Sequence, residues 1–511
     1  MSNFLPHTAA DRQAMLKAIG VSGIDALFED IPAQLRGPKH YTALPADGLS
    51  ELEIQDALKQ LATENKATEL ACFLGGGAYD RFIPQAVNTI ASRSEFATSY
   101  TPYQPEISQG TLQVIYEFQS MMASLTGMDV VNASVYDGAS AVTEAALMAA
   151  RLTKRNHIWV SRNVHPDYRR VLSTYVQANQ SLSLQEFSAN IQPEELPRSE
   201  NNPACIILQW PGYLGTLEDP TPWQAYCEQH QILLVVVADP VSLGVLEPPG
   251  QYGASIVVGE LQPLGNHLAY GGPYCGYIAT RKQYLRQLPG RLVGRSVDSQ
   301  GRPCFTLTLQ TREQHIRREK ATSNICTNQA LNLLKATVYL SLLGPQGLAT
   351  VASVSAQRCH YLVEKLCQIE GIALLFPDQP FLFEAALKLS QPTALFLKAL
   401  ERQGILGGIE LGKAYTEYPN ALLVTTTEKT HPNLIERYIQ VAKDFFNPAT
   451  AVSPPQALDE EEWARPSADP FAYAEKISAT GSGSLHHRNC VIVPAGNSNA
   501  PATSGEGVSA R

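Results

Sequence analysis

Side chains that could take part in chemistry cluster in one short segment of this chain, between Thr98 and Gly110. Tyr103, Gln104 and Glu106 place a hydroxyl, an amide and a carboxyl close together there. Prolines interrupt the segment, and because proline fixes φ and removes a backbone donor, we expect a rigid loop. Rigid polar loops often carry binding or catalytic groups, so these three residues are candidates for direct contact with a substrate or cofactor. The alternative is a structural loop that buries its tyrosines and opens the next helix.

The glycine pair Gly271 and Gly272, which precedes Pro273, is the second candidate. Glycine allows close approach of the backbone and leaves N–H groups free to point at an anion. The pattern favours a loop whose backbone N–H groups contact an anion. A plain turn at the start of a strand is the alternative.

Three further polar residues, Asp239, Glu260 and His267, follow apolar runs that are typical of strands. Asp239 precedes Pro240, a pattern that favours a turn over a binding site. Glu260 and His267 could hydrogen-bond to each other or face another chain. We expect a structural or solvated role for both.

The composition excludes several classes of function. The 511 residues carry a formal net charge of −9, which argues against a nucleic acid as the main partner, since neutralising phosphates needs clustered Lys and Arg. The nine cysteines lie singly along the chain with no CxxC pair, which argues against a disulfide framework and against a metal site. Cys326 and the other thiols are expected to be small core residues.

The same features predict a cytoplasmic protein. Residues 1–11 lack the basic start and the apolar stretch of a signal peptide. The longest apolar run, 232–238, is far shorter than the ~20 residues that cross a bilayer. We therefore expect neither membrane insertion nor a membrane partner.

The elements that must position the candidates begin with an N-terminal helical arm, residues 1–65. Thr8 can cap a first helix that stops at Gly20, and Ser50 with Glu53 can form a capping box for a second helix. So short a segment has little core of its own. We therefore expect the arm to pack on another surface.

Residues 66–350 alternate helices with short apolar strands. Continuous apolar strands suit a sheet that is covered on both faces, which indicates a large α/β domain with a mostly parallel sheet. The expected helices are 110–125, which stops at Gly127, and 138–151, and the expected strands are 158–161, 205–209, 232–238 and 255–258.

A small α+β domain is expected over residues 351–448, and a tail over 449–511. The tail is rich in small polar residues without periodicity, which predicts a disordered, low-complexity segment. The expected elements of the small domain are helices 355–367, 392–403 and 431–446 and strands 373–376 and 421–425.

Irregular segments spread along the chain carry a family resemblance. They are Phe73–Asp80, Glu95–Gly110, Leu125–Met128, Asn132–Gly138, Val257–Glu260, Gln262–Gly265, Gly271–Pro273, Ile316–Thr327, Gly404–Glu410 and Thr426–Lys429. These segments resemble the N-terminal half of glycine decarboxylase, the P protein of the glycine cleavage system, collinearly from about residue 3 to 447. Arg81 and Ser94 depart from the usual His and Pro, and Leu261 interrupts a usual Gly-Glu-Gly-Gln.

The resemblance implies the aspartate-aminotransferase-like fold of fold-type-I pyridoxal-phosphate enzymes, which agrees with a large α/β domain followed by a small α+β domain. Full-length members contain two homologous halves, and some bacteria make them as two chains. This chain therefore resembles the first subunit of a heteromeric glycine dehydrogenase. In such an enzyme glycine is decarboxylated with pyridoxal phosphate, CO2 is released, and the aminomethyl group passes to the lipoyl arm of H protein.

One absence decides what this chain could do by itself. Pyridoxal chemistry needs a lysine amine for a Schiff base and an acid under the ring. The implied fold places Asp239 as the acid and the lysine after the strand 255–258, yet no lysine lies between Lys154 and Lys282. Asp137, at the expected start of a helix, would also occupy the N–H groups of a phosphate site. We therefore expect a lysine-bearing subunit 2 to hold the cofactor.

The resemblance also implies roles across a subunit interface. Gly271 and Gly272 would contact the partner's pyridoxal phosphate, and Arg317, Arg318 and Lys320 could attract an acidic H protein. Ion pairing with neighbouring glutamates is the alternative for the basic residues. Two rival functions stay open. One is a catalytically silent scaffold that only stabilises the lysine-bearing chain or docks H protein, and the other is an independent enzyme.

Overall fold

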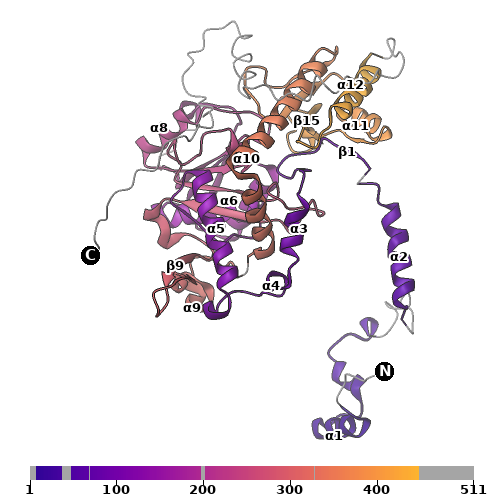
Figure 1. Cartoon of the computed structure of the whole chain (residues 1–511), viewed down its shortest axis with the longest axis vertical. Coiled ribbons are helices and arrows are strands. Elements are labelled where there is room, and N and C mark those ends of the chain that lie inside the picture. Colours follow the sequence, from indigo (N-terminus) through magenta and orange to yellow (C-terminus); the bar gives the residue numbers. More distant parts are fainter. Residues whose placement is uncertain (1–6, 37–47, 68, 197–201, 327, 448–511) are drawn as a thin grey trace. The chain divides into compact units, whose positions relative to one another are not determined.

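A computed structural model describes residues 7–36, 48–67, 69–196, 202–326 and 328–447. The chain divides into two compact units, Met1–Glu69 and Leu70–Arg511, and each is described by itself (Figure 1). The tail predicted over residues 449–511 lies outside the described residues.

The described residues of the first unit form short helices and contain no buried hydrophobic side chain. α1 (Ala9–Ile19) begins with a capping box at Thr8 and ends at Gly20, and α2 (Glu51–Glu64) begins with a capping box between Ser50 and Glu53, as predicted. Neither helix buries a residue. The large apolar residues exposed in this unit are Met15, Ile19, Ile24, Leu27, Phe28, Ile31, Leu35, Leu49, Leu52, Ile54, Leu58 and Leu61. That the arm packs on another surface stays a prediction.

A seven-stranded sheet forms the centre of the second unit, in the order β2-β8-β7-β6-β5-β3-β4. Strands β3 to β7 are parallel to one another, and β8 runs antiparallel to both β2 and β7, so the predicted mostly parallel sheet is confirmed. The strands are β2 (Val130–Val131), β3 (His157–Ser161), β4 (Ser183–Phe187), β5 (Cys205–Trp210), β6 (Leu233–Ala238), β7 (Ile256–Glu260) and β8 (Gly276–Thr280).

Helices cover both faces of this sheet because successive strand side chains point to opposite faces. Ile206 and Val236 pack with α5 (Gln109–Thr126), α8 (Thr221–His230) and the first half of α10. Ile207 and Val235 pack with α6 (Gly138–Thr153) and α7 (Pro166–Ala178). Each continuous apolar strand therefore contributes side chains to two hydrophobic clusters, one on each face of the sheet. The shorter elements of this region are α3 (Gln85–Ala91), α4 (Ser94–Ala97), the antiparallel pair β9 (Val293–Val297) and β10 (Pro303–Leu307), and α9 (Gln314–Arg317).

A four-stranded sheet, β11-β12-β15-β14, forms the smaller core, as expected for the C-terminal α+β part. Its helices α11 and α12 bury Phe396 and Tyr438 against the sheet. The elements are β11 (Ile372–Leu374), β12 (Glu384–Leu389), β14 (Ile409–Glu410), β15 (Ala421–Thr425), α11 (Thr393–Arg402) and α12 (Pro432–Phe446). In addition, β1 (Ala71–Cys72) pairs in parallel with β13 (Ile405–Leu406).

The long helix α10 (Ala330–Cys367) connects the two cores. It contributes Leu333 and Tyr339 to the larger core and Leu362 to the smaller one. The chain kinks at Gly344, where φ is 60°, just before Pro345. The sequence predicted only the part from residue 355, because a Gly-Pro pair normally ends a helix.

Two further sequence expectations concern single residues and length. Cys326 and Cys367 are exposed, so the expectation that all thiols are core residues is wrong for these two. Among the described helices, none is long and apolar enough to cross a bilayer.

Candidate functional site

Polar side chains gather where the parallel strands end. His165 follows β3, and Asp239 follows β6. Glu260 is the last residue of β7, and Gln262 comes shortly after it; both are buried. The carboxyl ends of parallel strands meet at one edge of a sheet, which is where α/β proteins bind ligands. This carboxyl edge is also where the resemblance places pyridoxal phosphate.

Glu260 is the buried acid of the carboxyl edge, and its carboxylate accepts four backbone N–H groups. Oε2 accepts from Gly138 at 2.9 Å. Oε1 accepts from Leu261 at 2.9 Å, from Gln262 at 3.2 Å and from Cys275 at 2.8 Å. Burial raises the pKa of Glu260 to about 8, and the N–H groups of Cys275 and Gly138 oppose that rise. Glu260 therefore has the structural role that the sequence favoured, and no hydrogen bond joins it to His267 within the described part of the chain.

At the N-terminus of α6, the N–H groups of Gly138 and Ser140 are already bound by side chains of this chain. Asp137 caps the helix as predicted, and its Oδ1 accepts the N–H of Ser140 at 2.7 Å. Glu260 takes the N–H of Gly138. The Tyr168 hydroxyl also covers Gly138, since a Cβ built there would lie only 2.4 Å from that oxygen. Helix N-termini bind phosphate through free N–H groups, and here the first-turn groups of Gly138 and Ser140 are occupied.

An aromatic stack fills the neighbouring space. The rings of His165 and Tyr168 stack with centroids 4.5 Å apart and an interplanar angle of 15°. The ring of Tyr213 meets His165 at 4.8 Å, edge on. Burial lowers the pKa of His165 to about 4, so its imidazole is neutral at pH 7, and its Nδ1 accepts the N–H of Asp167 at 3.1 Å. Tyr168 therefore occupies a face of the His165 ring on which a planar ligand could otherwise stack.

Asp239 acts as a turn former, the alternative that the sequence favoured. Its Oδ1 accepts the N–H of Ser242 at 2.8 Å, and its backbone carbonyl accepts the Ser242 hydroxyl at 2.7 Å. Burial raises the pKa of Asp239, against the opposing charge of Arg81. The Tyr277 hydroxyl donates to the adjacent carbonyl of Ala238 at 3.1 Å.

Gln262 and Glu384 close the carboxyl edge on the side of the smaller sheet. The Gln262 amide donates to the carbonyl of Tyr79 at 3.0 Å and accepts the N–H of Tyr79 at 2.8 Å. The Tyr79 hydroxyl in turn donates to Glu384 at 2.8 Å. Glu384 also accepts the N–H of Gly76 at 2.6 Å and the hydroxyl of Thr425 at 2.9 Å. The glycine-rich segment around Gly76 is thus held between the two sheets.

These residues do not fit pyridoxal phosphate. No lysine lies in the chain after β7 before Lys282, so an amine is missing. The N–H groups that would bind a phosphate already bind Glu260 and Asp137. The side chain that could stack on a pyridine ring already stacks on Tyr168. The carboxyl edge is a closed polar core of the protein.

The candidates Tyr103, Gln104 and Glu106 lie elsewhere, in and before the 3-10 turn Pro105–Ile107. All three are exposed, Tyr103 to 44%. Gln104 and Glu106 form no side-chain hydrogen bond or ion pair with any other described residue. Tyr103 is different, because its hydroxyl accepts from Arg291 Nη2 at 3.1 Å.

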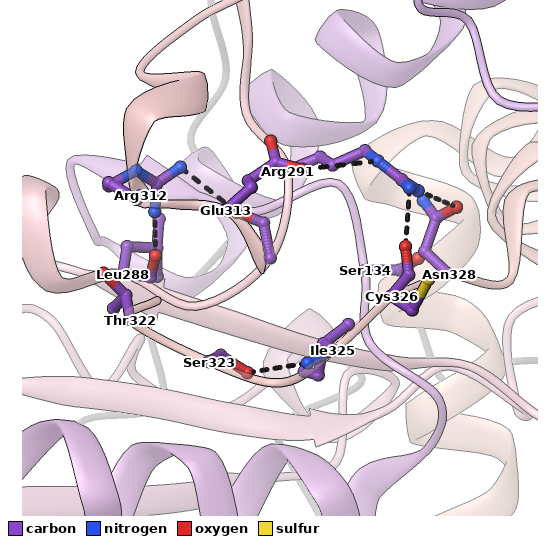
Figure 2. A pocket seen from close by; sticks show the side chains of 11 residues that line it. Ser134, Leu288, Arg291, Arg312, Glu313, Thr322, Ser323, Ile325, Cys326 and Asn328 are labelled. Carbon is purple, nitrogen blue, oxygen red and sulfur yellow. Dashed lines mark hydrogen bonds and ion pairs between the residues drawn. The ribbon is translucent and has the colours of Figure 1, made fainter. Parts of the chain in front are cut away.

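Arg291 also borders a small cavity of about 20 Å³ (Figure 2). Its guanidinium donates to the carbonyl of Cys326 at 2.6 Å and to Asn328 Oδ1 at 3.4 Å. Glu313 Oε2 lies 3.8 Å from Arg291 Nε. The cavity is lined by Ser134, Leu288, Gly290, Arg291, Arg312, Glu313, Thr322, Ser323, Ile325, Cys326 and Asn328.

Gly271 and Gly272 form an exposed turn after β7. Their φ angles are 91° and 139°, and Gly272 donates its N–H to the carbonyl of Ala269 at 2.8 Å. Tyr270, next to them, is fully exposed. Within the described chain no hydrogen bond, ion pair or ring contact joins this turn directly to Tyr103.

The ion-pairing alternative for the basic segment is wrong. Glu313 lies beside Arg291 and His315 instead. No ion pair joins Arg317, Arg318 or Lys320 to any described residue. His267 contacts Asn88, with 3.2 Å between Nε2 and Nδ2.

Sequence reasoning missed Tyr168 and Arg291. Tyr168 lies one turn after His165, so a His-Pro-x-Tyr pattern just past a strand was the available signal. Arg291 gives no signal of its own, because Tyr103, Cys326 and Asn328 reach it from segments far away in the chain.

Comparison with known proteins gives consistent relatives. A family model described as glycine cleavage system P-protein matches residues 2–441. The probable glycine dehydrogenase (decarboxylating) subunit 1 of Desulforamulus reducens is 46% identical over 438 residues, which cover 85% of this chain and 97% of that protein. The protein of the same name from Geobacillus thermodenitrificans is 44% identical over 449 residues, 87% of this chain and 99% of that protein.

Solved structures confirm the predicted fold class. A crystal structure of glycine decarboxylase (P-protein) of the glycine cleavage system, in inhibitor-bound form, is 40% identical with a TM-score of 0.75, over 86% of this chain and 99% of that chain. A C-DES mutant with glycine covalently linked to its PLP cofactor is 15% identical with a TM-score of 0.51, over 73% and 96%. The sphingosine-1-phosphate lyase of Burkholderia pseudomallei is 14% identical with a TM-score of 0.57, over 78% and 91%. The fold is that of fold-type-I pyridoxal-phosphate enzymes.

The buried neutral state of His165 predicts an acid sensitivity. Its pKa of about 4 in the folded chain lies below the ordinary 6.5, so the folded state loses stability as pH falls from 6.5 toward 4. His165→Asn keeps an N-cap acceptor and should reduce the slope of unfolding free energy in this window by about one proton, about 1.4 kcal/mol per pH unit. Urea titrations at several pH values measure it. Equal slopes in the wild type and the His165 variant would contradict the assignment.

Restoring an amine should not restore a cofactor site. We expect Gln262→Lys to show no Schiff-base absorbance with pyridoxal phosphate, because the donors for a phosphate and the stacking position stay occupied. Borohydride reduction followed by peptide mass spectrometry measures labelling at each lysine, and the wild-type chain gives the background at surface lysines. Stoichiometric labelling at position 262 would show that the carboxyl edge is open.

Proposed function

Because this chain belongs to the glycine cleavage system P-protein family, we propose that it is the subunit of a two-chain glycine dehydrogenase (decarboxylating) that carries no cofactor lysine. In this proposal a homologous, lysine-bearing subunit 2 holds pyridoxal phosphate. Glycine loses its carboxylate as CO2, and the aminomethyl group passes to the lipoyl arm of H protein. The cofactor, where bound, supplies the electron withdrawal that decarboxylation needs.

One observation carries the proposal. At the carboxyl edge, Glu260 binds the N–H of Gly138, and no lysine is present between Lys154 and Lys282. A chain of this fold with a closed carboxyl edge needs a second polypeptide for amine chemistry. The name of its relatives, subunit 1, supports the same division of labour.

Exposed apolar side chains next to both candidate segments support an interface there. Tyr100 is 82% exposed and Ile107 77%, on either side of Tyr103. Leu268 and Tyr270, which precede the Gly271–Gly272 turn, are exposed as well. Large exposed apolar and aromatic residues mark interaction surfaces. We infer that subunit 2 covers these segments, so that Tyr103, Gln104, Glu106 and the glycine turn approach the partner's cofactor and glycine.

Docking of H protein is the second part of the proposal. Arg317, Arg318 and Lys320 are exposed and pair with no acid among the described residues. Unpaired positive charge steers an acidic partner, and salt screens such steering. These residues are therefore our candidates for the approach of a lipoylated H protein.

The proposal is tested by comparing the isolated chain with the assembled enzyme. With added pyridoxal phosphate the isolated chain should show no Schiff-base band and release no CO2 from glycine. Co-expression with the homologous lysine-bearing chain should give a complex that does both. A Schiff-base band or turnover by the isolated chain would favour an independent enzyme and contradict the proposal. Normal turnover after Glu106→Gln and Tyr103→Phe together, in an intact complex, would favour the silent scaffold.

The contact of the glycine turn with the partner's cofactor has its own test. Gly272→Leu should weaken retention of pyridoxal phosphate in the assembled enzyme by about tenfold, about 1.4 kcal/mol, because a side chain at φ 139° is strained and blocks close approach. Cofactor absorbance after repeated gel filtration measures retention. Gly301→Leu is the control, since Gly301 also has a positive φ, 77°, in an exposed turn with open space around it. Equal retention in both variants would remove the contact.

A further inference from the structure

Arg291 is a buried cation that joins three segments remote in sequence. Only 6% of its surface is exposed. One N–H of Nη2 donates to the Tyr103 hydroxyl at 3.1 Å and the other to the carbonyl of Cys326 at 2.6 Å, while Nη1 reaches Asn328 at 3.4 Å. The last two contacts are drawn in Figure 2. A guanidinium can divide its donors in this fixed geometry, whereas a lysine amine is a point charge on a flexible stem.

Tyr103 is held by its ring as well as by its hydroxyl. The guanidinium carbon of Arg291 lies 5.4 Å from the centroid of the Tyr103 ring, within the range of a cation–π contact. The ring of His315 meets Tyr103 edge on at 5.4 Å. An exposed tyrosine on a loop would normally sample several rotamers, but these contacts select one. The loop presents a phenol in a defined place.

The charges around Arg291 keep it in position. Glu313 Oε2 lies 3.8 Å from Arg291 Nε and 3.7 Å from His315 Nδ1. The neighbouring Arg312 turns to backbone carbonyls, those of Leu288, Gly290 and Leu309. Buried charges persist when they are paired and hydrogen-bonded. Glu313 therefore orients Arg291, and Arg291 orients Tyr103.

The direction of the hydrogen bond leaves the phenol as a donor. Arg291 has no acceptor, so the Tyr103 oxygen must accept. No described residue takes the proton of that hydroxyl. A neighbouring cation favours donation by a phenol, so the Tyr103 proton is available to an oxygen of a ligand outside this chain.

We propose that Arg291 is a positioning residue, which fixes the Tyr103 hydroxyl as a donor toward the substrate or cofactor held by subunit 2. The role rests on the proposed function and deepens it. In this role Arg291 touches no ligand itself. It sets the position of the Tyr103 hydroxyl, which does.

Hydrogen exchange in the isolated chain tests the positioning without any activity. Arg291→Lys should accelerate amide exchange in peptides that cover residues 98–108, because the loop loses the bond to its tyrosine. Arg169→Lys is a matched control, since Arg169 is also buried and also divides its donors between a carbonyl, Val164 at 3.0 Å, and a carboxylate, Glu186 at 2.5 Å. Unchanged exchange over 98–108 in the Arg291 variant would overturn the proposal.

A double-mutant cycle in the assembled enzyme tests the function. Tyr103→Phe and Arg291→Lys should each lower kcat/KM for glycine by about tenfold, and the double variant should be no slower than the slower single variant. Arg169→Lys combined with Tyr103→Phe should give independent, multiplied effects. If the losses in kcat/KM of the Arg291 and Tyr103 variants multiply in the double variant, the role of Arg291 is only structural. If the wild-type complex releases no CO2, the proposed function fails and the positioning role fails with it. An active complex with multiplied losses overturns only the positioning role.

Discussion

The bond between the Glu260 carboxylate and the N–H of Gly138 is the constraint on which the rest of the molecule depends. It joins the end of β7 to the start of α6, a helix N-terminus of the kind that can bind an anion. A carboxyl oxygen of the chain itself occupies the N–H group of Gly138 at this helix N-terminus. With Tyr168 stacked on His165 beside it, the carboxyl edge needs no ligand to be satisfied. The chain has the fold of a pyridoxal-phosphate enzyme, but its own side chains occupy the carboxyl edge of the sheet.

The sequence predicted the architecture well because its signals are local. Strands buried on both faces read as continuous apolar runs, so β5, β6 and β7 fell within a residue or two of their bounds. Capping boxes at Thr8 and Ser50 depend only on neighbours three residues apart. The first half of α10 was missed for the opposite reason. There a local breaker, the pair Gly344-Pro345, is overruled by tertiary packing of Leu333 and Tyr339 on the large core.

Some features of the candidate site could likewise be predicted from local sequence signals, and others could not. That Asp137 caps α6, and that a lysine is missing, could be read from the sequence alone. What fills the cofactor position could not, because Glu260 and Gly138 lie far apart in the chain and meet only in the fold. The surroundings of Tyr103 are of the same kind, since Arg291 reaches it across 188 positions. Long-range polar contacts leave no period or spacing for sequence reasoning to detect.

A chain whose carboxyl edge does not fit pyridoxal phosphate has a physical reason to keep so large a fold. Loops present groups accurately only when rigid elements fix both of their ends. The segment with Tyr103 is fixed at its end by Gln109, whose amide exchanges two hydrogen bonds with Phe305, at 2.8 and 2.9 Å. Arg291 fixes its middle. Both anchors lie in or next to the β9–β10 pair, which in turn packs on α5. A smaller scaffold could carry the same loop sequence, but it would lack the buried arginine and the strand edge that set its shape. The large core therefore fixes the shape of the loop that carries Tyr103. In the proposed enzyme this loop contacts the neighbouring subunit.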